Sequence, residues 1–258
     1  MNQQNKQPKQ RNISLLLLTK NEEKNLAVNF SWLKKCPRIN EIIAVDDFSA
    51  DHTLNELKKL HAATYQRKLN GNFSQQRIYG LSHTHNNWIL WLDADEKPSP
   101  SLIKFLKQVN LDQKLSYAFK RTDFFAGKRL HHGETGKLHF IRLFDKRYGL
   151  FENAVHEIWV SCQPVKNLSF QIFHHPHQNL ASFIKKINLY SDIRAQELYR
   201  QKHVTNIFEI IFYPMAKFFY NYLYRLGFLD STPGLIMALG MSLHSFLVRA
   251  KLWHLQQA

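Results

Sequence analysis

Three carboxylates lie within four consecutive positions of the stretch WILWLDADEKPSPSL, residues 88–102: Asp93, Asp95 and Glu96. They follow an apolar run that is typical of a buried strand. Two carboxylates spaced one residue apart in a turn can bind a divalent cation together with a sugar or ribose hydroxyl. Mg²⁺ and Mn²⁺ take few protein carboxylates and complete their shells with water and phosphate oxygens. The spacing therefore indicates a site for a nucleotide diphosphate and a metal.

The same polar pattern follows two earlier apolar runs, as TKNE (19–22) and as DDFSAD (46–51). Acids in a solvated turn that cap the next helix are the simpler interpretation of a single DxD. Three such strand ends in a chain with a formal net charge of +15 favour one shared acidic pocket with a positive occupant.

The elements that must position these residues alternate along the first hundred residues. Parallel strands with helices on both faces are predicted from this alternation, and such sheets bind ligands outside the carboxyl ends of their strands. Ser99 followed by Pro100 is a helix-start signal. Strands are expected at 13–18, 41–45 and 88–92, and helices within 21–35, 50–62, 74–83 and after Ser99.

The second half of the chain has a different pattern. Strands are predicted at 117–125, 138–145 and 168–175, with loops at 129–136 and 152–157. From about Asn179 onward the pattern is helical and crowded with aromatic residues. Charged residues interrupt the first helical stretch, and the uncharged part of the second, 233–248, is shorter than the ~20 apolar residues of a clean membrane crossing.

Composition sets limits on the class of protein. A chain of 258 residues with 44% hydrophobic content can bury one substantial core. Two distant cysteines, Cys36 and Cys162, favour a reducing compartment, and the polar N-terminus shows no export signal. The basic balance suits polyanionic partners: nucleic acid, anionic lipid headgroups or phosphorylated glycans.

Several motifs together resemble one enzyme family. TKNEEKN, AVDDFSADHT, QQRIYGL and WILWLDADE are similar to the family 2 inverting glycosyltransferases, which have the GT-A fold for nucleotide-diphospho-sugars. RTDFFAGKRLHHG, HFIRLFD, ENAVHE and GFLDSTPGL resemble the subgroup that adds glucose to the heptose of the lipopolysaccharide inner core. Phe48 and Ile78 depart from the family pattern, which usually has Gly and Asn at these two positions.

The resemblance implies roles for the matching residues. Thr19 and Glu22 would border the nucleotide, and Asp46 or Asp47 would hydrogen-bond the uracil. Arg77 would lie near the diphosphate, Asp93 would face the ribose and donor sugar, and Asp95 would bind Mg²⁺ or Mn²⁺. These donor-side and metal residues are Thr19, Glu22, Asp46, Asp47, Arg77, Asp93 and Asp95.

Displacement at the anomeric carbon needs a base for the proton of the acceptor hydroxyl. Glu157 is favoured because it follows the mixed strands in a loop, while Asp123 and Glu134 stay open as alternatives. His156 beside it is a candidate metal ligand, although a lone histidine is more often structural. A set of basic residues is predicted to form a solvated face or to meet acceptor phosphates: Lys120, Arg121, Lys128, Arg129, Arg142, Lys146 and Arg147.

These expectations amount to an α/β protein of GT-A fold, with a mostly parallel sheet, helices on both faces and a C-terminal helical region. The predicted parts are a tail (1–12), a catalytic domain (13–178, with a donor half to 110 and an acceptor half from 111) and a helical region (179–258). The implied reaction moves glucose from UDP-glucose to a lipid-linked core oligosaccharide, at the cytoplasmic side of the bacterial inner membrane, with peripheral contact to that membrane.

Three alternatives stay open at this point. Another UDP-sugar, or another acceptor such as a polysaccharide or polyprenyl phosphate, would suit the same motifs. A basic nucleic-acid-binding protein would suit the charge, but it has no use for three acidic strand ends, which would repel phosphates in the absence of a metal.

Overall fold

The computed structural model of the chain describes residues 11–112, 114–135, 139–154, 157–176 and 180–257. The chain forms two compact units, one made of the residues up to Phe119 with His139–Ile172, the other of Lys120–Leu138 with Phe173 onward. The acceptor half predicted for 111–178 is thus shared between the two units, because the strands β6 (Ser116–Phe125) and β11 (Val165–His174) each run from one unit into the other.

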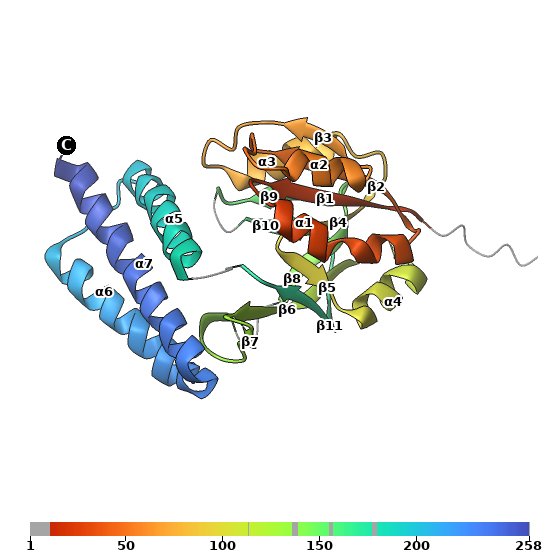
Figure 1. Cartoon of the computed structure of the whole chain (residues 1–258). Helices are drawn as coiled ribbons and strands as arrows, with labels where there is room; N and C mark the ends of the chain where they lie inside the picture. Colours follow the sequence, from red (N-terminus) through yellow and green to blue (C-terminus); the bar gives the residue numbers. More distant parts are fainter. Residues whose placement is uncertain (1–10, 113, 136–138, 155–156, 177–179, 258) are drawn as a thin grey trace, which may run out of the picture. The chain divides into compact units, whose positions relative to one another are not determined.

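Alternating strands and helices build the first unit, as the sequence predicts (Figure 1). Its elements up to α4 are β1 (Ile13–Thr19), α1 (Glu23–Asn29), a 3₁₀ turn (Ser31–Lys35), β2 (Ile39–Asp46), α2 (Thr53–Lys59), β3 (Ala63–Gln66), α3 (Phe73–Ser82), β4 (Trp88–Asp93), β5 (Glu96–Pro98) and α4 (Pro100–Gln108). The predicted start of α4 is confirmed, since Ser99 Oγ accepts a hydrogen bond from the Leu102 N–H.

The sheet has the strand order β3-β2-β1-β4-β8-β6-β11-β5, with β7 paired to β6. The pairs β3–β2, β2–β1 and β1–β4 are parallel, and β8 joins β4 antiparallel. The remaining strands are β7 (Lys128–Arg129), β8 (His139–Asp145), β9 (Gly149–Glu152) and β10 (Ile158–Ser161), of which β9 and β10 form a separate antiparallel pair.

Side chains of both faces of the sheet are buried, because helices lie on each side. Leu15 and Leu17 of β1 belong to a core shared with α1, α2 and α4. Leu16, between them, points into a second core with residues of α3 and the β9–β10 pair. A strand buried on both faces reads as a continuous apolar run, which is what ISLLLL shows.

Helix α3 lies close against β1 and β2. A Cβ atom on Gly80 would lie 2.4 Å from Leu16 Cδ1, so a larger residue here would require the buried Leu16 side chain to move. Arg77 lies one turn earlier on the same helix.

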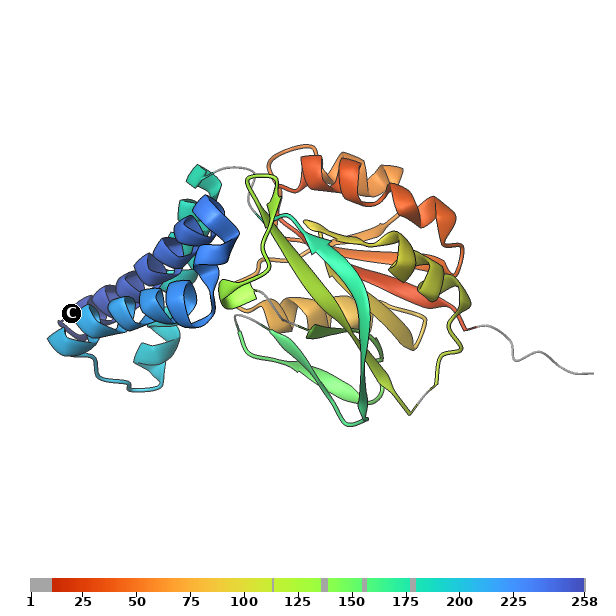
Figure 2. The ribbon, with the colours of Figure 1, turned by 90° about the horizontal axis from the view of Figure 1, so that it is seen from below.

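The second unit holds the C-terminal helices. They are α5 (Leu180–Arg200), α6 (Ile207–Phe219), a π-helical turn (Tyr220–Tyr224), a 3₁₀ turn (Gly227–Asp230) and α7 (Ser231–Gln257), and a further 3₁₀ turn spans Gly133–Thr135. Helix α7 packs against both α5 and α6. It lies between them in Figure 1, and Figure 2 shows the same three helices from below. By length and composition, Gly227–Gln257 could cross a membrane, with a mean hydropathy of 1.3 over an 18-residue window.

Candidate functional site

The carboxyl ends of three parallel strands lie side by side in the first unit. Thr19 of β1 is in register with Asp46 of β2, and Leu18 is in register with Asp93 of β4. The prediction that three acidic strand ends share one edge is therefore confirmed in its geometry.

Asp46 is fully buried, and both of its carboxylate oxygens accept hydrogen bonds from the protein. Thr19 Oγ1 donates to Oδ1 over 2.9 Å, and the Ser49 N–H donates to Oδ2 over 2.9 Å. Ser49 Oγ adds a third bond over 2.5 Å. The carboxylate thus ties β1 to the turn after β2.

Asp47 is more accessible, with 26% of its side chain exposed. Its Oδ1 accepts the Leu69 N–H over 3.1 Å, while Oδ2 lies 3.7 Å from Lys20 Nζ. Of the two acids predicted to meet a uracil, Asp47 has the geometry to reach a ligand.

Phe48 keeps the tight turn despite replacing the usual glycine. It adopts φ = 51°, in the left-handed region, with its ring exposed. Lys20 Nζ donates to the carbonyl oxygens of Asp47 and Phe48, and Asp46 holds the following residue. The unfavourable backbone conformation is thus balanced by these hydrogen bonds. Ile78, the other departure, is exposed on α3.

Glu22 lies just before α1 at the same edge. Its backbone N–H donates to Thr53 Oγ1 over 2.8 Å, and its carboxylate accepts from Asn25 Nδ2 over 2.6 Å. The side chain thus belongs to the α1–α2 junction beside the strand ends.

The DADE turn is held from two sides. Asn29 of α1 donates to the Ala94 carbonyl oxygen over 3.0 Å, and the Asp93 N–H donates to Glu96 Oε2 over 3.1 Å. Glu96 is fully buried and pairs with Arg142 Nη2 at 2.5 Å. Glu96 therefore fixes the shape of the turn that carries Asp93 and Asp95.

Arg77 lies beneath this turn and is only 1% exposed. Its Nη2 pairs with Asp93 Oδ1 at 2.5 Å and with Glu157 Oε1 at 2.7 Å, and its Nε donates to Glu157 over 2.8 Å. One guanidinium thus joins the DADE turn to the predicted base. Its predicted place beside a diphosphate stays a prediction, since the described contacts are with carboxylates.

Trp91 stacks with two guanidinium groups. The Cζ atoms of Arg77 and Arg142 lie 4.0 and 3.6 Å from the centre of its ring, and its Nε1 donates to the Ile141 carbonyl over 2.6 Å. Arg77 Nη1 and Arg142 Nη1 are buried without a hydrogen-bond partner. Stacking on an aromatic face compensates in part for such donors.

Charge sets the protonation of Asp93, whose side chain is 34% exposed. Burial by itself would raise the pKa of Asp93, but the guanidinium groups of Arg77 and Arg142 lower it below its ordinary value. The charge of Asp95 acts in the opposite direction. Asp93 is therefore ionised at neutral pH, with Asp95 close enough to influence it.

Of the two places predicted for Arg142, a solvated basic face or a site that meets acceptor phosphates, the solvated face is wrong. The residue is 2% exposed and contacts Asp93, Glu96 and Trp91. Sequence reasoning missed the roles of Arg142, Glu96 and Trp91. The alternation of side chains along β4 was an available signal for Trp91, because residues two positions apart in a strand, such as Trp91 and Asp93, lie on the same side.

Glu157 lies directly before β10, with 12% of its side chain exposed. His156, the predicted second metal ligand, lies outside the described residues. The two alternative bases belong to the other unit. There Asp123 pairs with His174 Nδ1 and with Arg121 Nε at 3.1 Å, and Glu134 pairs with Lys217 at 2.9 Å.

The donor set fits a hard cation that takes few protein ligands. No cluster of three or more His, Cys, Asp or Glu side chains suited to a metal occurs among the residues that the structure describes. Both oxygens of Asp93 face guanidinium groups. The assignment of Asp95, which is 7% exposed, as the metal ligand stays a prediction. One carboxylate plus phosphate oxygens is a usual environment for Mg²⁺.

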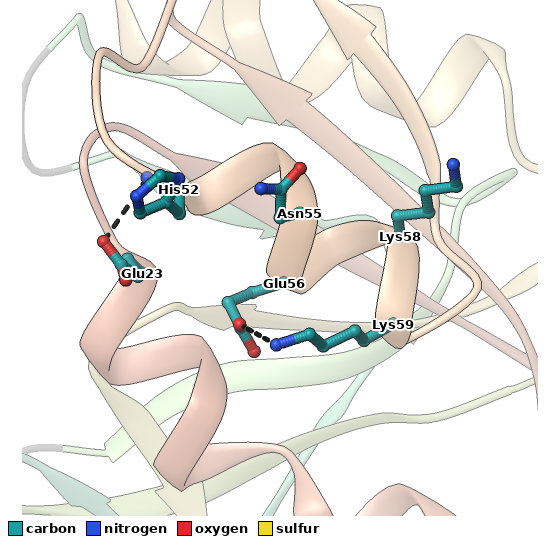
Figure 3. Close-up of a pocket in the computed structure, with 6 residues that line it drawn as sticks. All are labelled: Glu23, His52, Asn55, Glu56, Lys58 and Lys59. Atoms are coloured by element: carbon teal, nitrogen blue, oxygen red, sulfur yellow. Dashed lines mark hydrogen bonds and ion pairs between the residues drawn. The ribbon is translucent and has the colours of Figure 1, made fainter.

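A hollow of about 570 Å³ lies elsewhere on the first unit, along α1 and α2 (Figure 3). In the close-up, Glu23 meets the start of α2 at His52, and Glu56 pairs with Lys59 at 2.5 Å. Its walls are surface side chains of these two helices, and none of the predicted site residues lines it. The strand ends, and not this hollow, are the candidate active site.

Comparison with known proteins identifies the family of the chain. Residues 14–168 match the family profile "Glycosyl transferase family 2". An uncharacterized glycosyltransferase of Rickettsia typhi is 26% identical over 244 residues, which is 88% of this chain and 82% of that protein. One of Rickettsia felis is 25% identical over 260 residues, covering 93% and 89%.

Among solved structures, the crystal structure of S. aureus TarS 1–349 aligns with a TM-score of 0.44 and 13% identity, over 95% of this chain and 91% of that one. The α/β fold of GT-A type that the motifs predicted is confirmed by the sheet and by the family profile. Because that profile covers more than half of its length, the chain belongs to glycosyltransferase family 2 and is a sugar-transferring enzyme.

Proposed function

We propose that the protein is a metal-dependent inverting glycosyltransferase that moves glucose from UDP-glucose to a heptose of the lipopolysaccharide or lipooligosaccharide inner core. The observation that carries this proposal is the register of Thr19, Asp46 and Asp93 at one sheet edge, with Asp95 two positions beyond. The choice of glucose and heptose rests on the motifs of the second half of the sequence.

Each residue has a task in the proposed reaction. Thr19, Glu22 and Asp47 border the nucleotide, and Asp93, kept ionised by two arginines, accepts hydrogen bonds from ribose and donor-sugar hydroxyls. Asp95 and His156 would hold the metal, which would supply positive charge for the departing diphosphate. Arg77 positions Asp93 and Glu157 relative to each other.

The acceptor hydroxyl oxygen forms a bond to the anomeric carbon on the side opposite the diphosphate. The bond from that carbon to the diphosphate oxygen breaks, and UDP leaves with the electron pair. The proton of the hydroxyl passes to Glu157, whose Oε1 is held by Arg77 while its other oxygen faces no described partner. A carboxylate that an arginine keeps in one position is suited to accept this proton.

The acceptor is lipid-linked in this proposal. The enzyme then works at the cytoplasmic face of the inner membrane, in peripheral contact through its C-terminal helices. The site would serve another UDP-sugar or another acceptor by the same chemistry, so the test varies both.

The test offers the purified protein a panel of nucleotide sugars with truncated core glycolipid and identifies the product by mass. We expect a mass increase of one hexose with UDP-glucose, and loss of transfer with a chelator. A product from a different sugar or acceptor would replace the named substrates but leave the reaction class intact. No transfer from any nucleotide sugar would refute the proposal.

Two variants test the residue roles. Asp95→Ala is expected to abolish transfer, whereas Glu56→Ala, a surface acid of α2, leaves it unchanged. Glu157→Gln keeps an oxygen that accepts from Arg77, so donor binding should persist while transfer falls by about 10²-fold or more. Near-normal transfer by Glu157→Gln would move the base to Asp123 or Glu134.

A further inference from the structure

Helix α6 and the π-helical turn after it carry a continuous row of exposed apolar side chains, here called the apolar stripe. Its members recur every three or four positions, so they share one face of the helix. Their exposed fractions run from 49% to 68% for Phe208, Ile211, Phe212, Met215, Phe219 and Leu223. A contiguous exposed surface of this kind marks an interaction site.

The opposite face of α6 packs within its own unit. Pro214 and Asn221 are buried, and the Pro214 carbonyl oxygen accepts from Ser242 Oγ of α7 over 2.8 Å. Lys217, which falls about 180° around the helix from Phe208, pairs with Glu134. The apolar stripe therefore points away from α7, and its exposure is a property of the folded helical unit.

Basic residues flank the two ends of the stripe along the chain. The residues assigned to this unit include 14 Lys and Arg against 6 Asp and Glu, a formal charge of +8. Arg200 and Lys202 are exposed just before α6, and Arg225 just after its π-helical turn. The one acid of α6, Glu209, is bound to Thr205 and His203.

Charge complementarity selects an anionic bilayer surface over a second copy of the chain. Two copies joined through this face would bring the basic side chains of one copy near those of the other. Anionic headgroups would instead attract these side chains, with about 1 kcal/mol for each basic residue near the surface as the usual scale. Exposed Tyr220 and Tyr224 at the end of the stripe suit the same interface.

Helix α6 with its π-helical turn is poorly suited to cross a bilayer, because its 18 residues extend about 27 Å against a core of about 30 Å and include the charged Glu209 and Lys217. Helix α7 is long enough, yet it is the centre of the helical unit. Gly240 lies against the ring of Phe183, and Lys251 pairs with Asp192 at 2.6 Å. A spanning α7 would have to abandon these contacts with α5.

We infer that α6 and its π-helical turn lie in the plane of an anionic membrane surface, with the apolar stripe among the acyl chains and α7 outside the bilayer. This inference deepens the proposed function, on which it rests for the lipid-linked acceptor. The binding itself needs no nucleotide sugar, so it is measured separately.

The first experiment sediments the full chain with vesicles of phosphatidylcholine alone or with phosphatidylglycerol, without a nucleotide sugar. Binding should be strong only with the anionic lipid and should fall at least about tenfold in Phe208→Ser/Phe212→Ser, since affinity scales with inserted apolar area. The matched control is Ile184→Ser/Leu189→Ser on α5, also exposed, which should change binding less than about twofold. Arg200→Gln/Lys202→Gln keeps the stripe and should weaken binding to the anionic vesicles alone.

The second experiment locates the helix. Cys36 is buried and Cys162 is exposed, so Cys162→Ser provides a background for a single polarity-sensitive dye. A dye on Phe212→Cys should shift to the blue with anionic vesicles, and a dye on Leu243→Cys of α7 should not.

Each remaining outcome has a defined meaning. No vesicle binding, equal binding by both double serine variants, or a blue shift at position 243 would overturn the inference. So would a dimer in analytical ultracentrifugation that Phe208→Ser/Phe212→Ser dissociates, in which case a second copy covers the stripe. UDP-glucose hydrolysis without vesicles is measured in parallel. If the protein binds vesicles but hydrolyses no UDP-glucose, the result counts against the proposed function alone.

Discussion

Replacing Arg77 by methionine distinguishes two roles for this arginine: positioning Asp93 and Glu157, and contacting the diphosphate directly. Arg77 is 1% exposed, joins Asp93 and Glu157 through three contacts of 2.5–2.8 Å, and stacks on Trp91 at 4.0 Å. Methionine keeps the apolar stem and removes the guanidinium. It therefore leaves Glu157 and Asp93 without their shared cation.

The magnitude follows from burial. Removing one partner of a buried ion pair lowers the free energy of unfolding by about 3–5 kcal/mol, because a charge stays behind uncompensated. Asp93 is one-third exposed and solvates part of its charge. We therefore expect a loss of about 3 kcal/mol, a large fraction of the 5–15 kcal/mol typical of a folded protein.

Urea unfolding followed by near-UV circular dichroism measures this loss, with transfer activity recorded on the same preparations. Arg77→Lys is the control that keeps the charge, and it should lose less stability. Adding Glu157→Gln to Arg77→Met should restore part of the loss, since one uncompensated carboxylate disappears. A loss below about 1 kcal/mol, together with abolished transfer, would refute the positioning role and favour direct contact with the diphosphate.

Three further results are expected. Asp46→Ala should lower the free energy of unfolding by about 2–3 kcal/mol, because buried donors from Thr19 and Ser49 lose their acceptor. Asp47→Ala should mainly raise the KM for the donor. If Asp47→Ala instead lowered stability and Asp46→Ala raised the KM, the two roles would be exchanged. Phe48→Gly should raise the free energy of unfolding by about 1 kcal/mol, since glycine adopts φ = 51° without strain; a lower melting temperature would contradict this. Asp93 has a folded-state pKa below its ordinary value, so the stability it contributes is fully present above about pH 4 and is lost as pH falls through the lower folded value. In Asp93→Asn the free energy of unfolding should therefore decrease less at acid pH, and the same decrease as in the unmodified protein would refute this prediction.

The candidate residues for binding and reaction could be named from the sequence, because short-range patterns carry them. Apolar runs followed by acids marked the ends of β1, β2 and β4, and Ser99 with Pro100 marked the start of α4. Alternation of strands and helices required a parallel arrangement, and parallel strands bring their carboxyl ends to one edge. These features depend on neighbours within a few positions, so a single sequence was sufficient for the fold class and for the acidic edge.

Tertiary structure decided which of those residues are held and which are available. Asp46 and Asp47 look equivalent in sequence, but burial takes both oxygens of Asp46 and leaves Asp47 accessible. Arg142 looks like a surface charge, yet β8 lies beside β4 and places it over Trp91. Contacts between residues 16 to 80 positions apart, such as those of Arg77 with Asp93 and Glu157, depend on packing in space, which local sequence patterns do not encode.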